Sequence, residues 1–243
     1  MMKSIGRRRR LYSALAVIFL ALLVASPGAH PAVGGQDAEK EILKVENAIR
    51  VLEEMMKESD KSIPLGLLER CAGIAVIPDV IRAGLVIGAR HGKGVLLVRK
   101  DGAGWSDPVF IDIKGGSLGW QVGVQSADVV LVFMTGRSIE NIAAGQFTLG
   151  ADAGVAAGPL GRQAEASTDT EFKAEILSYS RSRGLYAGIT LQGSSIQVDR
   201  KANGNFYGRD GITARDILDG KAPQPPAVAA GLKRALAGVE QEK

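Results

Sequence analysis

The residues that most often perform catalysis are scarce in this chain. Of its 243 residues only two are histidines, His30 and His91, and Cys71 is the only cysteine. A zinc site needs several Cys or His ligands at short spacings, and the sequence contains no such cluster. A serine hydrolase would have to use His91, and no serine stands in a Gly-x-Ser-x-Gly sequence. We therefore expect no enzyme activity, no metal site and no cofactor.

One glycine-rich segment, GARHGKG at residues 88–94, looks like a phosphate-binding loop at first sight. Only three residues separate Gly88 from Gly92, where the phosphate-binding motif requires four. Gly94 also stands where the motif has the serine or threonine that holds Mg²⁺. We therefore interpret this segment as a hairpin turn.

Hydroxyl, basic and aromatic residues are interleaved in the sequence SYSRSRGLY at residues 178–186. In an extended strand Tyr179, Arg181 and Arg183 point to one face and the serines to the other. A pair of guanidinium groups suits a phosphate or a carboxylate, and a tyrosine ring suits the interface of a membrane. We take these three residues, together with Arg162, as candidates for binding a lipid headgroup. The alternative is a solvated hairpin end whose arginines pair with internal carboxylates.

Small residues dominate the segment 147–162, in which Gly150, Gly154 and Gly158 recur every four residues. That spacing places all three glycines on one face of a helix or of a strand. We interpret them as structural glycines, because a flat surface of small residues lets another backbone approach closely. We predict that Gly154→Val costs several kcal/mol, because overpacking alone costs about 1–3 kcal/mol and any positive φ at this position adds to that cost.

The net charge of +4 comes from 30 basic and 26 acidic residues, but it is unevenly distributed. Residues 1–29 combine five basic residues, no acidic residue, and an apolar run from Leu11 to Ala25 followed by small residues. This pattern predicts a secretory signal peptide; an uncleaved anchor is the alternative, although a helix of this run would span only about 22 Å of a ~30 Å membrane core. The remaining chain is nearly neutral, which argues against a nucleic-acid partner.

Hydrophobic periodicity predicts the elements of the remaining chain. An acidic amphipathic helix is predicted from Asp37 to Ser59, and we expect it to pack on the domain rather than on a membrane. Short apolar runs separated by Gly-rich or charged turns predict antiparallel strands, because too little sequence lies between them for crossover helices. The predicted strands are residues 73–78, 85–89, 94–98, 109–113, 129–134, 174–180 and 185–191, and the further helices are 62–71, 139–144, 212–218 and 228–239.

Six blocks of sequence, in order along the chain, carry a family resemblance. They are residues 94–98 (GVLLV), 104–110 (GWSDPVF), 115–123 (GGSLGWQVG), 128–134 (DVVLVFM), 150–159 (GADAGVAAGP) and 179–185 (YSRSRGL). Together they resemble the SYLF domain over about residues 38–220. The resemblance implies a lipid- and actin-binding module, with phosphoinositide binding in eukaryotic members and actin-filament binding in fungal ones.

These observations lead to one set of expectations. The fold is α+β, with a large, strongly bent antiparallel sheet, open or barrel-like, and flanking N- and C-terminal helices. Residues 1–29 form a signal peptide, 37–220 a SYLF-like domain, and 221–243 a Pro-containing linker with a C-terminal helix. We expect an exported, periplasmic or secreted protein that binds anionic phospholipid or a membrane surface, with envelope proteins as further partners. Actin is not expected as a partner. The alternative is a structural or protein-interaction module of the cell envelope without a small ligand.

Overall fold

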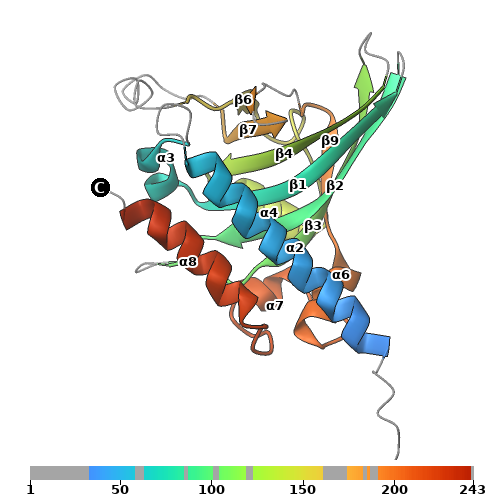
Figure 1. Cartoon of the computed structure of the whole chain (residues 1–243), viewed down its shortest axis with the longest axis vertical. Coiled ribbons are helices and arrows are strands. Elements are labelled where there is room, and N and C mark those ends of the chain that lie inside the picture. Colours follow the sequence, from blue (N-terminus) through green and yellow to red (C-terminus); the bar gives the residue numbers. More distant parts are fainter. Residues whose placement is uncertain are drawn as a thin grey trace, which may run out of the picture.

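A computed structural model describes residues 33–57, 63–84, 87–100, 104–118, 123–160, 174–182, 185–186 and 191–241. In this part of the chain nine strands form one curled sheet with helices on both of its faces (Figure 1). The helices are α2 (Val33–Met56), α3 (Leu65–Arg70), α4 (Gly136–Ala144), α6 (Arg200–Tyr207), α7 (Ala214–Leu218) and α8 (Val228–Gln241). The strands are β1 (Gly73–Gly84), β2 (Ile87–Val98), β3 (Val109–Leu118), β4 (Gly123–Phe133), β5 (Gln146–Thr148), β6 (Val155–Ala157), β7 (Ile176–Ser182), β8 (Leu185–Tyr186) and β9 (Ser194–Val198). The predicted α+β fold with a strongly bent sheet is confirmed.

The sheet has the strand order β5-β9-β3-β2-β1-β4-β7-β6, and β8 pairs with β7. All neighbouring strands are antiparallel, as predicted, except β6, which runs parallel to β7. Among the described residues the outermost strands β5 and β6 do not pair with each other. The sheet is therefore a curled half-barrel rather than a closed barrel.

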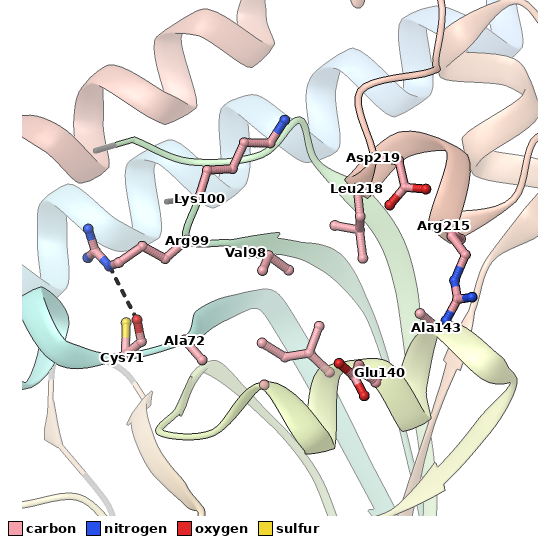
Figure 2. Close-up of a pocket in the computed structure, with 12 residues that line it drawn as sticks. Cys71, Ala72, Val98, Arg99, Lys100, Glu140, Ala143, Arg215, Leu218 and Asp219 are labelled. Atoms are coloured by element: carbon pink, nitrogen blue, oxygen red, sulfur yellow. Dashed lines mark hydrogen bonds between the residues drawn. The ribbon is translucent and has the colours of Figure 1, made fainter. Parts of the chain in front are cut away.

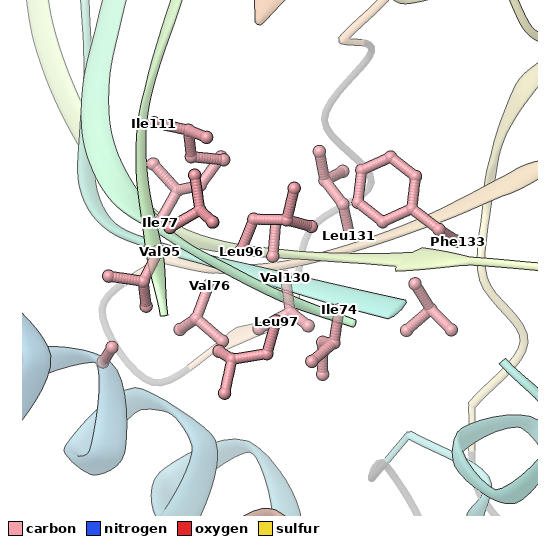
Figure 3. Packing of buried hydrophobic residues seen from close by; sticks show 14 of the residues in the cluster. Ile74, Val76, Ile77, Val95, Leu96, Leu97, Ile111, Val130, Leu131 and Phe133 are labelled. Carbon is pink, nitrogen blue, oxygen red and sulfur yellow. The ribbon is translucent and has the colours of Figure 1, made fainter. Parts of the chain in front are cut away.

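The central strands are buried on both of their faces. In Figure 3, Val76 and Leu97 point toward α2, whereas Leu96, Leu131 and Phe133 point to the opposite side of the sheet. All five side chains are at most 1% exposed. Strands that are covered on both faces have continuous apolar sequences rather than an alternation of apolar and polar residues. The central parts of β1, β2 and β4 show this pattern.

Helix α2 packs on the domain, as its acidic polar face predicted. It begins at Val33, before the predicted start at Asp37, and lies beside α8, with further contacts to α6 and β1 (Figure 1). Its buried face contains Val45, Ala48, Leu52 and Met55. None of the helices in the described ranges is long and apolar enough to cross a membrane.

Strand β1 continues through Pro78, the last residue of the predicted strand 73–78. The register with both neighbouring strands shifts around Pro78 and Asp79, which marks a β-bulge. Asp79 has φ 49°, and its backbone N–H donates to Oδ1 of Asp128 on β4 at 3.1 Å. The bulge leaves Pro78, which has no N–H to donate, outside the regular hydrogen-bond ladder, and it bends the sheet.

Beyond the bulge, four strand segments form a region that reaches past α2 and is here called the extension (Figure 1). They are residues 80–84, 87–92, 113–118 and 123–127.

Two predicted turns are wrong. Residues 91–93 lie inside β2, so the predicted strands 85–89 and 94–98 are one long strand. Residues 114–116 lie inside β3, which continues the predicted strand 109–113 as far as Leu118. The glycines in these strands serve close packing rather than chain reversal. A Cβ at Gly94 would lie 2.2 Å from the carbonyl oxygen of Val76, and a Cβ at Gly115 would lie 2.7 Å from Oγ of Ser194.

Strand β9 and helix α6, which follow each other directly in the chain, are not among the predicted elements. Strand β9 inserts between β5 and β3, and Asp199 then caps α6 by accepting from the N–H of Ala202 at 3.0 Å. Asn203 on α6 is fully buried and clamps the start of β3. Its Oδ1 accepts from the N–H of Phe110 at 2.9 Å, and its Nδ2 donates to the carbonyl oxygen of the same residue at 3.2 Å.

Candidate functional site

The structure places the predicted headgroup site on β7 partly in the core. Arg181 forms an ion pair with Glu54 of α2 and also donates to the backbone carbonyl of Glu54. Tyr179 lies on the same face of β7 but is only 2% exposed, so its ring cannot lie at a membrane interface in this conformation. Burial raises the pKa of the Tyr179 hydroxyl well above its usual value. Arg162 and Arg183 lie outside the described residues.

The three glycines of segment 147–162 do not share one environment. Gly158 faces the ring of Tyr179, and a Cβ there would lie 2.1 Å from Cζ. Gly150 has φ +86°, a conformation that favours glycine. Gly154 is exposed, and the nearest atom to a Cβ there is the Cα of Ala174 at 3.9 Å. The large cost predicted for Gly154→Val is therefore wrong, because the position offers room, and the close approach is made by Gly158.

The outer face of the extension, on the side of the sheet that α2 covers elsewhere, is exposed. Its outermost row consists of Val124, Ala83, Ala89 and Gly116, which are cross-strand partners in this order. The next row consists of Ser126, Ile81, His91 and Lys114. Cross-strand partners lie on one face of a sheet, so these residues form a continuous surface. Two large aliphatic side chains on it are strongly exposed, Val124 at 72% and Ile81 at 48%.

The inner face of the extension is polar and partly closed. Arg82 and Arg90 are cross-strand partners there, and Arg90 is 5% exposed. Its guanidinium crosses Gly115, which has no side chain, and donates to Oγ of Ser194 at 2.7 Å. Burial and the neighbouring charge of Arg82 lower the pKa of Arg90. The two faces of the extension therefore differ: one buries the guanidinium group of Arg90, and the other exposes aliphatic side chains.

A pocket of about 800 Å³ lies at the opposite end of β1 and β2 from the extension. It is bounded by α4 and α7 (Figure 2). Arg99 helps to form its wall: the Nε atom donates to the carbonyl oxygen of Cys71 at 3.2 Å, and the guanidinium stacks 4.4 Å from the centre of the Trp105 ring. Cys71 itself is buried and donates to the carbonyl oxygen of Leu68 at 3.1 Å. Arg99 therefore fixes the end of β2 against the turn after α3.

The pocket is lined by both basic and acidic side chains. Its titratable side chains are Arg99, Lys100, Glu140, Arg215 and Asp219, besides the buried thiol, and it contains no histidine. His91 lies at the other end of β2, on the extension. Within the described ranges no three His, Cys, Asp or Glu side chains are grouped as ligands for a metal ion.

The features of these two surfaces had not been identified from the sequence. The only local signal for Val124 and Ile81 is the polar residue that follows each of them, Gln125 and Arg82, because the residues before them, Gly123 and Val80, are not polar. Lys100 and Arg215 carry no such signal, since they come together only through the placement of α7 beside the end of β2.

Comparison with known proteins gives a consistent set of similarities. A family model, Ysc84, described as "Las17-binding protein actin regulator", matches residues 114–239. The SH3 domain-containing YSC84-like protein 1 of Rattus norvegicus is 40% identical over 167 residues, which cover 68% of this chain and 48% of the relative. LAS seventeen-binding protein 3 of Saccharomyces cerevisiae is 40% identical over 174 residues, 70% of this chain and 37% of the relative. The chain thus spans half or less of the length of these relatives. The expectation that actin is not a partner is contradicted by these descriptions.

Proposed function

The chain belongs to the Ysc84 family, the family of the SYLF domain, and on this premise we propose that it is an exported, non-catalytic protein that binds anionic phospholipid surfaces. The proposed contact is the outer face of the extension. It replaces the site expected on β7, because Tyr179 is buried and Arg181 is paired with Glu54. The extension reaches past α2, so the helix layer does not cover this face (Figure 1).

The exposure of Val124 and Ile81 carries this proposal. Soluble proteins rarely expose aliphatic side chains together on a flat surface unless that surface binds something. Removing each of these side chains from water is worth about 1–2 kcal/mol, given that complete burial of Val or Ile is worth about 1.5–3 kcal/mol. Lys114, in the next row, adds about 1 kcal/mol of binding free energy near an anionic surface. Its ion pair with Asp112 at 2.7 Å reduces this contribution. Apolar contact is therefore the larger contribution.

The test replaces both aliphatic side chains, Ile81→Ser with Val124→Ser, and measures co-sedimentation with vesicles of anionic and of zwitterionic phospholipid. A loss of about 2–3 kcal/mol corresponds to a 30- to 150-fold weaker binding. Leu43→Ser is the matched control, because Leu43 is 53% exposed on the outward side of α2. We expect the control to bind like the parent. Equal binding by the double variant and the parent would contradict the proposal.

Export is the second part of the proposal, and residues 1–29 support it by their basic start and apolar run. N-terminal sequencing of the protein from its native host is expected to show that at least the first 25 or so residues are missing, as a cleaved signal peptide requires. A protein that retains Met1 and remains in the cytoplasm would refute export, whatever the result with vesicles.

Binding to a protein partner is a second candidate function, which the descriptions of the family and of the yeast relative favour. The probe is filamentous actin, and the measurement is co-sedimentation at several salt concentrations. If this candidate is right, the parent sediments with the filaments in the absence of lipid. A parent that stays in the supernatant under all conditions rules out direct binding to actin filaments.

A further inference from the structure

The pocket between α4 and α7 lies at the end of the sheet that is remote from the extension. Strands β1 and β2 run from the extension to the pocket, and each is 12 residues long. At about 3.3 Å per residue such a strand spans about 40 Å. One flat membrane cannot contact both ends of the sheet, so the pocket needs an explanation of its own.

The floor of the pocket is apolar and belongs to the edge of the core. Ile139 on α4 is 3% exposed, and the other floor residues are partly buried and pack against the core. The volume of about 800 Å³ falls in the range of about 300–1,000 Å³ in which proteins hold small organic ligands. The floor side chains are Ala72, Val98, Ile139, Ala143 and Leu218.

The charged side chains around this floor fall into two groups. Arg99 is held by backbone carbonyls and by the Trp105 ring, and Asp219 pairs with Lys221 at 2.8 Å. The second group consists of Lys100, Glu140 and Arg215, which are exposed and make no ion pair or side-chain hydrogen bond with the described residues. They come from the end of β2, from α4 and from α7, respectively (Figure 2).

We propose that the pocket binds a single anionic amphiphile, a molecule with an apolar body and one phosphate, carboxylate or sulfonate group. The apolar body lies on the floor, and the anionic group is held by Lys100 and Arg215, whose flexible side chains enter from two different elements. Cations exceed acids around the pocket, since Arg99, Lys100 and Arg215 face Glu140 and Asp219. The surplus selects an anion over a cation of the same shape. Glu140 opposes this preference and limits the affinity.

This inference does not rest on the proposed membrane contact, because it concerns a dissolved ligand at the other end of the sheet. The measurement is a fluorescence titration of the purified protein with 8-anilinonaphthalene-1-sulfonate, followed by its displacement with decyl phosphate or decanoate below their micelle concentrations. Inorganic phosphate tests the head alone, decanol the tail alone, and decyltrimethylammonium the opposite charge. The extension variant Ile81→Ser with Val124→Ser is expected to bind these probes like the parent.

We expect decyl phosphate or decanoate to displace the probe. The compound that displaces it at the lower concentration shows whether the pocket prefers a phosphate or a carboxylate group. Lys100→Gln with Arg215→Gln is expected to weaken the anions about 30-fold, since each basic side chain contributes about tenfold or less. Decanol should bind both forms equally. Glu140→Gln is expected to strengthen the anions severalfold, and Arg137→Gln, an exposed arginine on the same helix outside the pocket, should change nothing.

Three results would overturn the assignment. The first is anion binding that the Lys100 and Arg215 double variant retains at the level of the parent. The second is weaker anion binding after Glu140→Gln, which would indicate that the acid contributes to the site. The third is displacement by inorganic phosphate or by decyltrimethylammonium as efficient as by decyl phosphate. Thermal melting of each variant shows whether a loss of binding reflects the site or the fold.

Discussion

Gly94→Ala is expected to destabilise the protein strongly, because the added methyl group would meet main-chain atoms of the neighbouring strand. A Cβ at position 94 would lie 2.2 Å from the carbonyl oxygen of Val76 and 2.7 Å from the Cα of Ile77. Both residues belong to β1, which pairs with β2 on one side and with β4 on the other. Strand β1 therefore cannot move away without weakening the centre of the sheet.

The size of the effect follows from the kind of atom that the methyl group meets. Overpacking a core usually costs about 1–3 kcal/mol, because side chains adopt poor rotamers to make room. Here the obstacles are backbone atoms that have no alternative rotamer, so we expect the upper end, about 3 kcal/mol. In a domain of this size 1 kcal/mol shifts Tm by about 2–4 °C, and the expected fall is about 6–12 °C.

Gly116→Ala is the matched control on the adjacent strand β3. Gly116 is exposed, and a Cβ there would meet nothing within 4 Å. Alanine also restricts the unfolded chain, so this variant is expected to be as stable as the parent or up to about 1 kcal/mol more stable. Both variants are compared with the parent by differential scanning calorimetry. If Gly94→Ala melts together with Gly116→Ala, the steric argument is refuted.

Three further predictions concern stability. Gly158→Val is expected to destabilise the protein by about 2–3 kcal/mol in chemical unfolding, because the valine side chain would collide with the buried ring of Tyr179. Gly154→Val is expected to be nearly as stable as the parent, and the reverse order of stability would contradict the packing described. Burial raises the pKa of Asp128, so the unfolding free energy of the parent falls as the pH rises from the unfolded-state pKa to the folded-state pKa. Asp128→Asn is therefore expected to be more stable than the parent at pH 7, with a gain that disappears at about pH 3.5, below the unfolded-state pKa; a gain that is equal at both pH values would exclude this cause. Asn203→Leu leaves the N–H and the carbonyl group of Phe110 on β3 without their partner, and it is expected to lower the unfolding free energy by about 2–4 kcal/mol in urea unfolding. An unchanged unfolding midpoint would show that water replaces the side-chain amide.

The sequence predicts well those helices whose limits depend on residues within the helix itself. Helix α7 lies within the predicted range 212–218 and is capped by Thr213, whose hydroxyl accepts from the N–H of Asp216 while the Asp216 carboxylate accepts from the N–H of Thr213. Helix α8 begins at Val228 as predicted. In both cases hydrogen bonding and apolar periodicity within one helix determine its limits.

The glycines of the sheet show where local patterns fail. Gly92 and Gly94 were interpreted as parts of a turn, yet both lie inside β2. A Cβ at Gly92 would lie 2.8 Å from Cγ2 of Val80, so the position is glycine because β1 approaches closely at its bulge. A glycine required by a neighbouring strand and a glycine required by a turn look the same in one sequence.

The candidate site illustrates a second limit. The alternation of side chains along β7 correctly places Tyr179 and Arg181 on one face of the strand. It does not predict which element covers that face. The partner of Arg181 is Glu54, which is 127 positions away in the chain. Likewise, Lys100 and Arg215 line one pocket only because α7 packs near the end of β2. Contacts of this kind depend on the whole topology, which no local pattern contains.

The contact between α2 and α8 has a consequence for how the chain folds. The first described helix and the last one lie side by side, and α8 buries Ala229, Leu232 and Leu236 in the common core. Until α8 has been synthesised, the part of α2 that it covers stays exposed. Folding dominated by such distant pairings is slow and exposes apolar surface to aggregation on the way. A chain cut at the prolines before α8 should therefore unfold at a lower denaturant concentration than the parent, because α8 covers part of α2 and of the core.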